Sequence, residues 1–142
     1  MSAIKVGVFG AAGRMGATVC GAVAADPELE LVAAIDPFHA GETVQGLTVS
    51  ASPDAMSEAG AQVAVDFTVL DAARANLAWC AANGVHAVVG TTGFGEADVA
   101  AARDSFTSSN CLIAPNFAVG AVLMMRFAEL AAPFFDTAEV IE

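Results

Sequence analysis

A chain of 142 residues has room for one globular domain, and Gly, Pro and polar residues interrupt its apolar runs before the roughly 18 to 20 residues of a membrane span. The N-terminus lacks the basic segment and long apolar stretch of a secretory signal, so we expect a soluble, cytoplasmic domain with no membrane partner. A net charge of −11 is the wrong sign for gripping a phosphate backbone, which excludes nucleic acid as an expected partner.

Short β-branched runs alternate along the chain with Ala-rich stretches of helical length. We predict strands over residues 4–9, 29–35, 63–67, 87–89 and 112–114, and helices over approximately 13–25, 70–82, 96–106 and 119–132. Residues 38–60 indicate a loop, with a short strand at 47–49 and a short helix near 54–58. The alternation predicts an α/β fold of the Rossmann type, a doubly wound parallel sheet with helices on both faces.

The first predicted strand runs directly into Gly10-Ala11-Ala12-Gly13-Arg14-Met15-Gly16, and a predicted helix follows. In such a loop one glycine lets the chain turn tightly, a second lets the backbone approach a pyrophosphate, and a third lets helix and strand pack together. The N–H groups at the helix start then point at the phosphates. The first interval is one residue longer than in the commonest dinucleotide fingerprint, so a glycine turn without a ligand is the alternative.

An acidic residue, Asp36, lies 20 residues after Gly16, at the end of the second predicted strand. A carboxylate there accepts hydrogen bonds from an adenosine ribose, although a surface Asp without a ligand is again the alternative. Asp36 favours the free hydroxyl of NADH and repels the 2′-phosphate of NADPH. Arg14, with Lys5 or His39 if the fold brings them close, would supply positive charge, so both coenzymes stay open.

The later predicted strands end in loops that carry Gly, hydroxyl and amide groups. Asp66-Phe67-Thr68 ends the third, Gly90-Thr91-Thr92-Gly93 follows the fourth, and Ala114-Pro115-Asn116-Phe117 follows the fifth. The carboxyl ends of parallel strands share one edge, and ligands bind there where the strand order reverses. Each loop alone is compatible with ordinary turn chemistry, but together they favour hydrogen bonding to a nicotinamide riboside.

The cysteines, Cys20, Cys80 and Cys111, are odd in number and far apart, and His39 and His86 are the histidines of the chain. We therefore predict reduced thiols that pack as small core residues, and no metal site.

Four segments together resemble the 4-hydroxy-tetrahydrodipicolinate reductases, formerly called dihydrodipicolinate reductases, of bacterial lysine and diaminopimelate biosynthesis. They are residues 10–16, 66–68, 89–94 and 114–120. The resemblance implies that the pyrophosphate is held by Gly10, Ala11, Ala12, Gly13, Arg14 and Met15, and the adenosine ribose by Asp36. It further implies a nicotinamide side formed by Gly90, Thr91 and Thr92, with Ala114, Pro115, Asn116, Phe117, Phe67 and Thr68 lining the same cleft.

In that family a hydride passes from NADH or NADPH to a cyclic imine-type small molecule, and the complete enzyme is a homotetramer. The family continues past the segment that matches 138–142 into a His-His and Lys motif and a Ser-Gly-Thr turn, which supply the proton donor and bind the substrate carboxylates. Neither His39 nor His86 matches those positions. The resemblance thus implies a dinucleotide-binding domain over 1–137, the start of a substrate domain over 138–142, no catalytic residue here, and no turnover by this chain alone.

Two other classes of protein fit the same sequence: a non-catalytic NAD(H)-sensing Rossmann module, and a structural domain that binds no ligand. Without the family's remaining segments, the apolar helix at 119–132 and the Pro133-Phe134-Phe135 run would stay exposed. We therefore also predict self-association or marginal stability for this chain.

Overall fold

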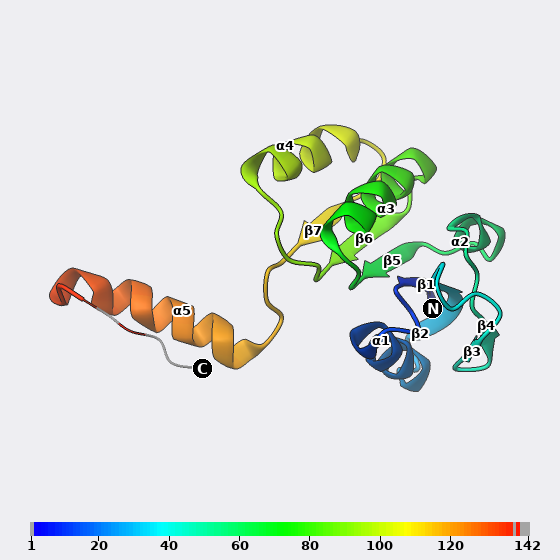
Figure 1. Ribbon diagram of the computed structural model, residues 1–142, viewed down its shortest axis with the longest axis horizontal. Coiled ribbons are helices and arrows are strands. Elements are labelled where there is room, and N and C mark those ends of the chain that lie inside the picture. The colour runs from blue at the N-terminus through cyan, green and yellow to red at the C-terminus, as the bar shows by residue number, and fades with distance from the viewer. Residues whose placement is uncertain (1, 138, 140–142) are drawn as a thin grey trace.

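A parallel sheet of five strands, in the order β2-β1-β5-β6-β7, forms the centre of the computed structural model, which describes residues 2–137 and 139 (Figure 1). The strands of this sheet are β1 (Ile4–Phe9), β2 (Leu29–Ile35), β5 (Val63–Asp66), β6 (His86–Val89) and β7 (Cys111–Ile113). The main helices are α1 (Arg14–Ala25), α3 (Leu70–Asn83), α4 (Glu96–Ser105) and α5 (Val119–Ala131). The predicted bounds of all these elements are confirmed to within one residue.

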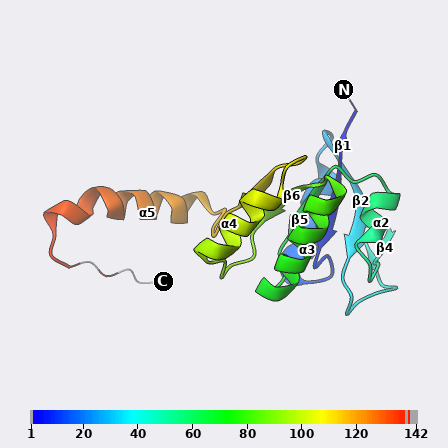
Figure 2. The ribbon, with the colours of Figure 1, turned by 90° about the horizontal axis from the view of Figure 1, so that it is seen from above.

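The strand order reverses between β1 and β5. The chain passes from β1 through α1 to β2, then returns across β1 to β5 and continues through α3 and α4 to β6 and β7. Because parallel crossovers are right-handed, this reversal places α1 on one side of the sheet and α3 and α4 on the other (Figures 1 and 2). The predicted doubly wound Rossmann-type fold is confirmed.

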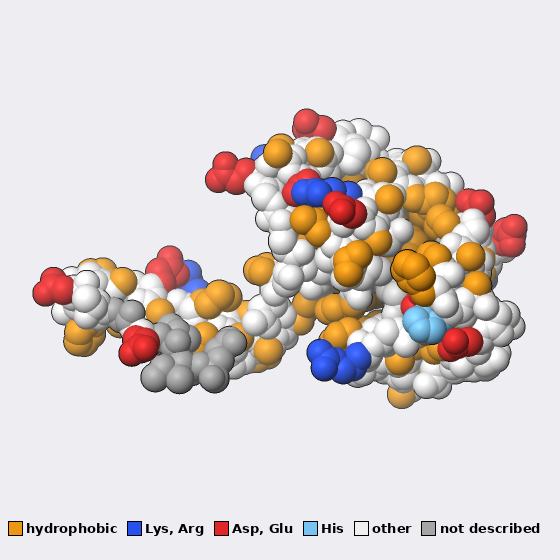
Figure 3. All heavy atoms as spheres, in the orientation of Figure 1, with side chains coloured by type: hydrophobic (Ala, Val, Ile, Leu, Met, Phe, Trp, Pro, Cys, Tyr) orange, Lys and Arg blue, Asp and Glu red, His pale blue; other side chains and the backbone are white. Residues whose placement is uncertain are grey.

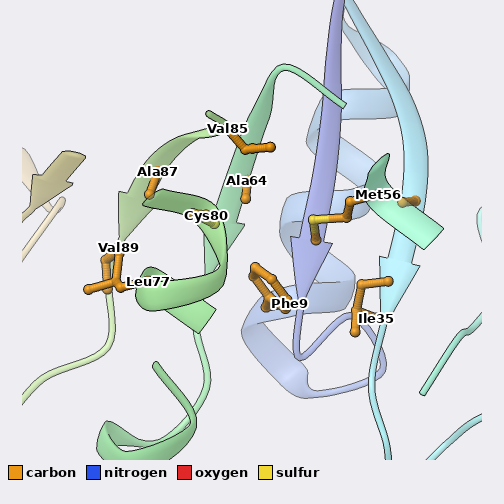
Figure 4. Packing of buried hydrophobic residues seen from close by; sticks show 10 residues of the cluster. Phe9, Ile35, Met56, Ala64, Leu77, Cys80, Val85, Ala87 and Val89 are labelled. Atoms are coloured by element: carbon orange, nitrogen blue, oxygen red, sulfur yellow. The ribbon is translucent and has the colours of Figure 1, made fainter. Parts of the chain in front are cut away.

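Two apolar clusters hold the helices on the two faces of the sheet. On one face, Val6 and Val8 of β1 pack with Cys20 and Val23 of α1. The other cluster joins the sheet to α3 and to α2 (Asp54–Glu58) (Figure 4). Its buried members are Phe9, Ala33, Ile35, Met56, Ala64, Leu77, Cys80, Val85, Ala87 and Val89.

The prediction that cysteines serve as core residues is confirmed for Cys20 and Cys80, which are both buried and unpaired. Burial raises the pKa of Cys20 to about 11 and that of Cys80 to about 12, so both thiols stay protonated near neutral pH. Within residues 2–137 and 139, no group of three His, Cys, Asp or Glu side chains gathers in a way that would hold a metal ion.

The segment between β2 and β5 contains a small hairpin, β3 (Thr43–Val44) paired antiparallel with β4 (Leu47–Thr48). The sequence predicted a strand at 47–49 and the short helix near 54–58, and both are present, but it missed β3. Gln45 and Gly46 both have positive φ, 48° and 81°, as a two-residue hairpin turn requires. Gly46 favours this conformation but Gln45 does not, so the first position of the turn has no local signal.

Helix α5, followed by the 3₁₀ turn η1 (Ala132–Phe134), stands apart from the sheet in both ribbon views (Figures 1 and 2). None of its residues is buried. Residues 138 and 140–142, at the predicted start of a further domain, lie outside the described residues. In the described part of the chain, no helix has the length and apolarity that crossing a bilayer requires.

Candidate functional site

Three loops at the carboxyl ends of β1, β2 and β5 enclose a cavity of about 360 Å³ at the point where the strand order reverses. Its lining residues come from the glycine loop, the turn after Ile35, the segment before Asp54, the loop after Asp66 and the first half of α3: Phe9, Gly10, Gly13, Ile35, Asp36, Pro37, Phe38, Ala51, Pro53, Phe67, Thr68, Val69, Ala72 and Asn76. A hollow of about 550 Å³ between α3 and α4 is larger, but alanine side chains form much of its lining. Convergent polar groups make the smaller cavity the candidate site.

The glycine loop is anchored to the end of β2 by its own backbone. Gly10, with φ of +69°, and Ala11 donate their N–H groups to the carbonyl oxygen of Ile35 at 2.8 and 3.1 Å. In contrast, the N–H groups of Arg14 and Met15, at the start of α1, have no partner among residues 2–137 and 139. These free donors at the positive end of a helix are suited to an anion such as a pyrophosphate.

Gly16, the third glycine of the motif, allows α1 to pass very close to this loop. A Cβ atom on Gly16 would lie 1.9 Å from the carbonyl oxygen of Gly10, and one on Gly13 would lie 3.2 Å from the same oxygen. The spacing of the glycines therefore serves the approach of the helix to the loop as well as the approach of a ligand.

The carboxylate of Asp36 is buried and lines the cavity. Its Oδ1 accepts a hydrogen bond from the backbone N–H of Phe38 at 3.1 Å, and the Nδ1 atom of His39 lies 3.1 Å from the same oxygen. Within the described part of the chain, Oδ2 accepts no hydrogen bond, so it remains able to accept one from a ribose hydroxyl.

Of the residues that the sequence offered as positive charges beside Asp36, His39 alone contacts it. The carboxylate of Asp36 beside this ring raises the pKa of His39 above its usual range. The idea that Lys5 lies near this site is wrong, because Lys5 is at the amino end of β1 and its Nζ lies beside Gly60. Arg14 is exposed at the start of α1.

The predicted nicotinamide-side loop is tied to the end of β5 through Thr91. Its hydroxyl donates to Oδ1 of Asp66 at 2.8 Å and accepts from the N–H of Thr68 at 2.9 Å. Because Thr91 is only 6% exposed and its hydroxyl hydrogen is donated to Asp66, the hydroxyl has no hydrogen left to donate to a ligand. The exposed side chain of this loop is that of the next residue, Thr92.

Aromatic contacts bring the loops after β5, β6 and β7 together. The rings of Phe67 and Phe117 lie 6.0 Å apart between centroids. Gly90 lies directly under Phe67, since a Cβ there would be 2.1 Å from the ring. Asn116 accepts a hydrogen bond from the N–H of Ala118 at 2.8 Å, at the start of α5.

The structure thus places the predicted site residues along one edge of the sheet, but in different roles. Those that line the cavity are Gly10, Gly13, Asp36, Phe67 and Thr68. The residues after β6 and β7, namely Gly90, Thr91, Thr92, Ala114, Pro115, Asn116 and Phe117, are not part of its lining. The side chain of Ala11 is fully buried in the core, so Ala11 offers a ligand only its backbone.

Phe38 and Asn76 are among the lining residues that were not predicted as site residues. Phe38 is 93% exposed at the rim of the cavity, and its position two residues after Asp36 was an available signal. Asn76 reaches the cavity from α3, where its amide bonds the carboxylate of Asp66 at 2.7 Å. Nothing in the local sequence pattern marks this asparagine, because its role depends on the packing of α3 against β5.

Comparison with known proteins shows the family of this chain. The family model described as "Dihydrodipicolinate reductase, N-terminus" matches residues 4–117. A 4-hydroxy-tetrahydrodipicolinate reductase of Thermobifida fusca is 50% identical over 142 residues, which are 98% of this chain and 52% of the relative. One from Nocardia farcinica is 48% identical with the same coverage. The chain therefore spans about half the length of the curated relatives it matches.

A solved structure shows the same likeness in three dimensions. The dipicolinate-bound dihydrodipicolinate reductase from Paenisporosarcina sp. TG-14 is similar with a TM-score of 0.78 and 30% sequence identity. The similarity covers 94% of this chain and 55% of that one.

Proposed function

Because the chain belongs to the dihydrodipicolinate reductase family, we propose that it is the coenzyme-binding domain of a 4-hydroxy-tetrahydrodipicolinate reductase and that it binds NADH in preference to NADPH. The observation that carries this proposal is that two free hydrogen-bonding functions lie at the same edge of the sheet, an acceptor on Asp36 in the cavity lining and donors that directly follow Gly13, which also lines the cavity. The N–H groups of Arg14 and Met15 are donors for a pyrophosphate, and Oδ2 of Asp36 is an acceptor for a ribose hydroxyl.

With the pyrophosphate at the start of α1 and the adenosine ribose at Asp36, the positions of the adenine and nicotinamide ends of the coenzyme follow. The exposed ring of Phe38 provides a flat apolar surface beside Asp36 for the adenine base. The nicotinamide end extends toward the loops after β6 and β7, where Thr92 and Asn116 are exposed polar side chains. The pyrophosphate can approach the loop backbone closely at Gly10, Ala11, Ala12 and Gly13.

In the complete enzyme, the coenzyme supplies a hydride for reduction of 4-hydroxy-tetrahydrodipicolinate to tetrahydrodipicolinate, in lysine and diaminopimelate biosynthesis. The residues of this chain bind and orient the coenzyme. His86 begins β6, at the amino end of the sheet, and its Nδ1 accepts a hydrogen bond from the N–H of Asn110 at 3.0 Å. A proton donor for the substrate is therefore assigned to a part of the enzyme beyond residues 1–137, with 138–142 as the start of that substrate domain.

Calorimetric titration with NADH, NADPH and NAD⁺ tests the proposal. We expect NADH to bind with one site per chain and to bind more tightly than NADPH. An assay with NADH and 4-hydroxy-tetrahydrodipicolinate is expected to show no turnover above background for the 142-residue polypeptide. Absence of binding for all three nucleotides would refute the proposal and favour a structural domain that binds no ligand. Turnover would refute the assignment of the proton donor to another segment.

We further propose that the complete enzyme is a cytoplasmic homotetramer.

Asp36→Asn tests the preference for NADH. The substitution removes the charge that repels a 2′-phosphate and weakens the acceptor for the ribose. We therefore expect the ratio of the NADPH dissociation constant to the NADH dissociation constant to fall by about tenfold or more. The matched control is Glu30→Gln, which removes the same charge from an exposed position on β2, the strand that Asp36 follows, and should leave the ratio unchanged. An unchanged ratio in Asp36→Asn would show that Asp36 does not distinguish the ribose hydroxyl of NADH from the 2′-phosphate of NADPH.

A further inference from the structure

The carboxylate of Asp66, at the end of β5, is 3% exposed and is surrounded by hydrogen-bond donors. Its Oδ1 accepts from the N–H of Thr68 at 2.9 Å, from the hydroxyl of Thr68 at 2.7 Å and from the hydroxyl of Thr91 at 2.8 Å. Its Oδ2 accepts from the side-chain amide of Asn76 at 2.7 Å. Each of these donors belongs to the protein, so the carboxylate is committed to internal bonds.

These bonds join three different segments of the chain. Thr68 is in the loop after β5, Thr91 is in the loop after β6, and Asn76 is on α3. The backbone adds one more link, because Gly90 donates its N–H to the carbonyl oxygen of Asp66 at 2.9 Å. Asp66 is therefore the shared point to which the loops after β5 and β6 are attached.

The network determines how the loop of residues 90–92 is oriented. With its hydroxyl drawn inward to Asp66, Thr91 is buried, and the neighbouring Thr92 is left exposed. The same inward position keeps Gly90 against the ring of Phe67, which in turn packs on Phe117. The glycine loop is held differently, by backbone bonds to Ile35, and Thr68 reaches it through a methyl contact rather than a hydrogen bond.

We propose that Asp66 is a positioning residue for the nicotinamide half of the coenzyme site, acting through Thr68 and Thr91, and that Asn76 completes its hydrogen bonding. This role rests on the proposed function. Loss of the carboxylate would free the loops after β5 and β6, while the adenosine half, held by residues 10–15 and Asp36, would keep its own anchors.

Three variants of the 142-residue chain, in which the carboxylate of Asp66 and the amide of Asn76 are exchanged singly and together, test this role. In Asp66→Asn, Thr68 and Thr91 donate to a neutral amide oxygen in place of a carboxylate, and the new amide nitrogen is satisfied only if the Asn76 side chain turns its oxygen toward it. In Asn76→Asp, two carboxylates face each other. The double variant Asp66→Asn/Asn76→Asp restores complementarity, since the amide at position 66 donates to the carboxylate at position 76 and still accepts from both threonines.

The readout is the affinity for NADH compared with that for ADP-ribose, which lacks the nicotinamide ring. We expect Asp66→Asn to raise the dissociation constant of NADH by about tenfold and that of ADP-ribose by less than about twofold. The double variant is expected to bring the NADH value back to within about threefold of the unmodified chain. Asp71→Asn, which changes a carboxylate on α3 that is 94% exposed, is the matched control and should change neither affinity.

Equal weakening of NADH and ADP-ribose by Asp66→Asn, or no weakening of NADH, would overturn the positioning role. Failure of the folded double variant to recover NADH binding would also overturn it. If Asp66→Asn does not fold, Thr91→Val removes only the hydroxyl bonded to Asp66, and the same difference between NADH and ADP-ribose is expected from it. An unmodified chain that binds neither ligand would instead refute the proposed function itself.

Discussion

Gly16→Ala is expected to destabilise the domain by about 3 kcal/mol and to abolish measurable NADH binding. The added Cβ would lie 1.9 Å from the carbonyl oxygen of Gly10 and 2.9 Å from the Cα of Ala11, so either α1 or the glycine loop must move. Both atoms belong to the backbone, and the loop is anchored to β2 through Ile35, so the contact cannot be relieved by a side-chain rotation. Urea unfolding and calorimetric titration with NADH measure the two effects.

The matched control is Gly21→Ala, in the same helix. A Cβ at Gly21 would meet only the amide nitrogen of Gln45, at 3.6 Å, which is an ordinary contact. Because alanine is the better helix former, we expect this substitution to stabilise the domain by about 0.5 to 1 kcal/mol and to leave NADH binding unchanged. The same sign of stability change for both variants would contradict the assignment of Gly16 to close packing.

The 142-residue polypeptide is expected to self-associate through α5. Leu123, Phe127 and Leu130 are 47%, 63% and 67% exposed, and Phe134 of η1 is 81% exposed. Hydrophobic side chains are visible along this projecting arm in Figure 3. Leu112 of β7, whose neighbours Cys111 and Ile113 pack on the α3 side, lies on the same face of the sheet as α1 and is a further exposed apolar residue, at 54%. Apolar surface of this extent is removed from water when chains associate.

Sedimentation velocity over a range of protein concentrations measures the association. The double variant Leu123→Gln/Phe127→Gln places polar groups four residues apart on one face of α5 and is expected to shift the protein to a monomer. Val99→Gln, on α4, alters an exposed apolar residue away from that helix and should leave the association unchanged. A monodisperse monomer for the unmodified chain at every concentration, with a sharp cooperative melt, would show that α5 is not an association surface.

The placement of the site loops along one edge could be predicted because it depends on local patterns. Strands such as 4–9 and 29–35 are short apolar runs bounded by Gly, Pro or charged residues, and parallel strands necessarily have their carboxyl ends on the same side. Asp36 therefore follows β2 at the edge where Gly10 follows β1. The hairpin partner β3 was missed because Gln45 gives no turn signal.

The roles of individual side chains at that edge were less predictable. The sequence placed Thr91 on the nicotinamide side as a ligand contact, whereas its hydroxyl is bonded to Asp66. Lys5 was offered as a charge near Asp36, although the length of β1 separates the two. Both differences concern partners that lie many residues apart in the sequence.

Periodicity and glycine spacing were enough to define the α/β class, the order of its elements and the loops that carry the site, since backbone conformation responds mainly to near neighbours. Which of those loop residues face a ligand and which bond to the protein was decided by packing. Asp66, Asn76 and Thr91 meet because α3 lies against β5 and β6, and a buried carboxylate must satisfy its oxygens with whatever donors that packing brings within reach.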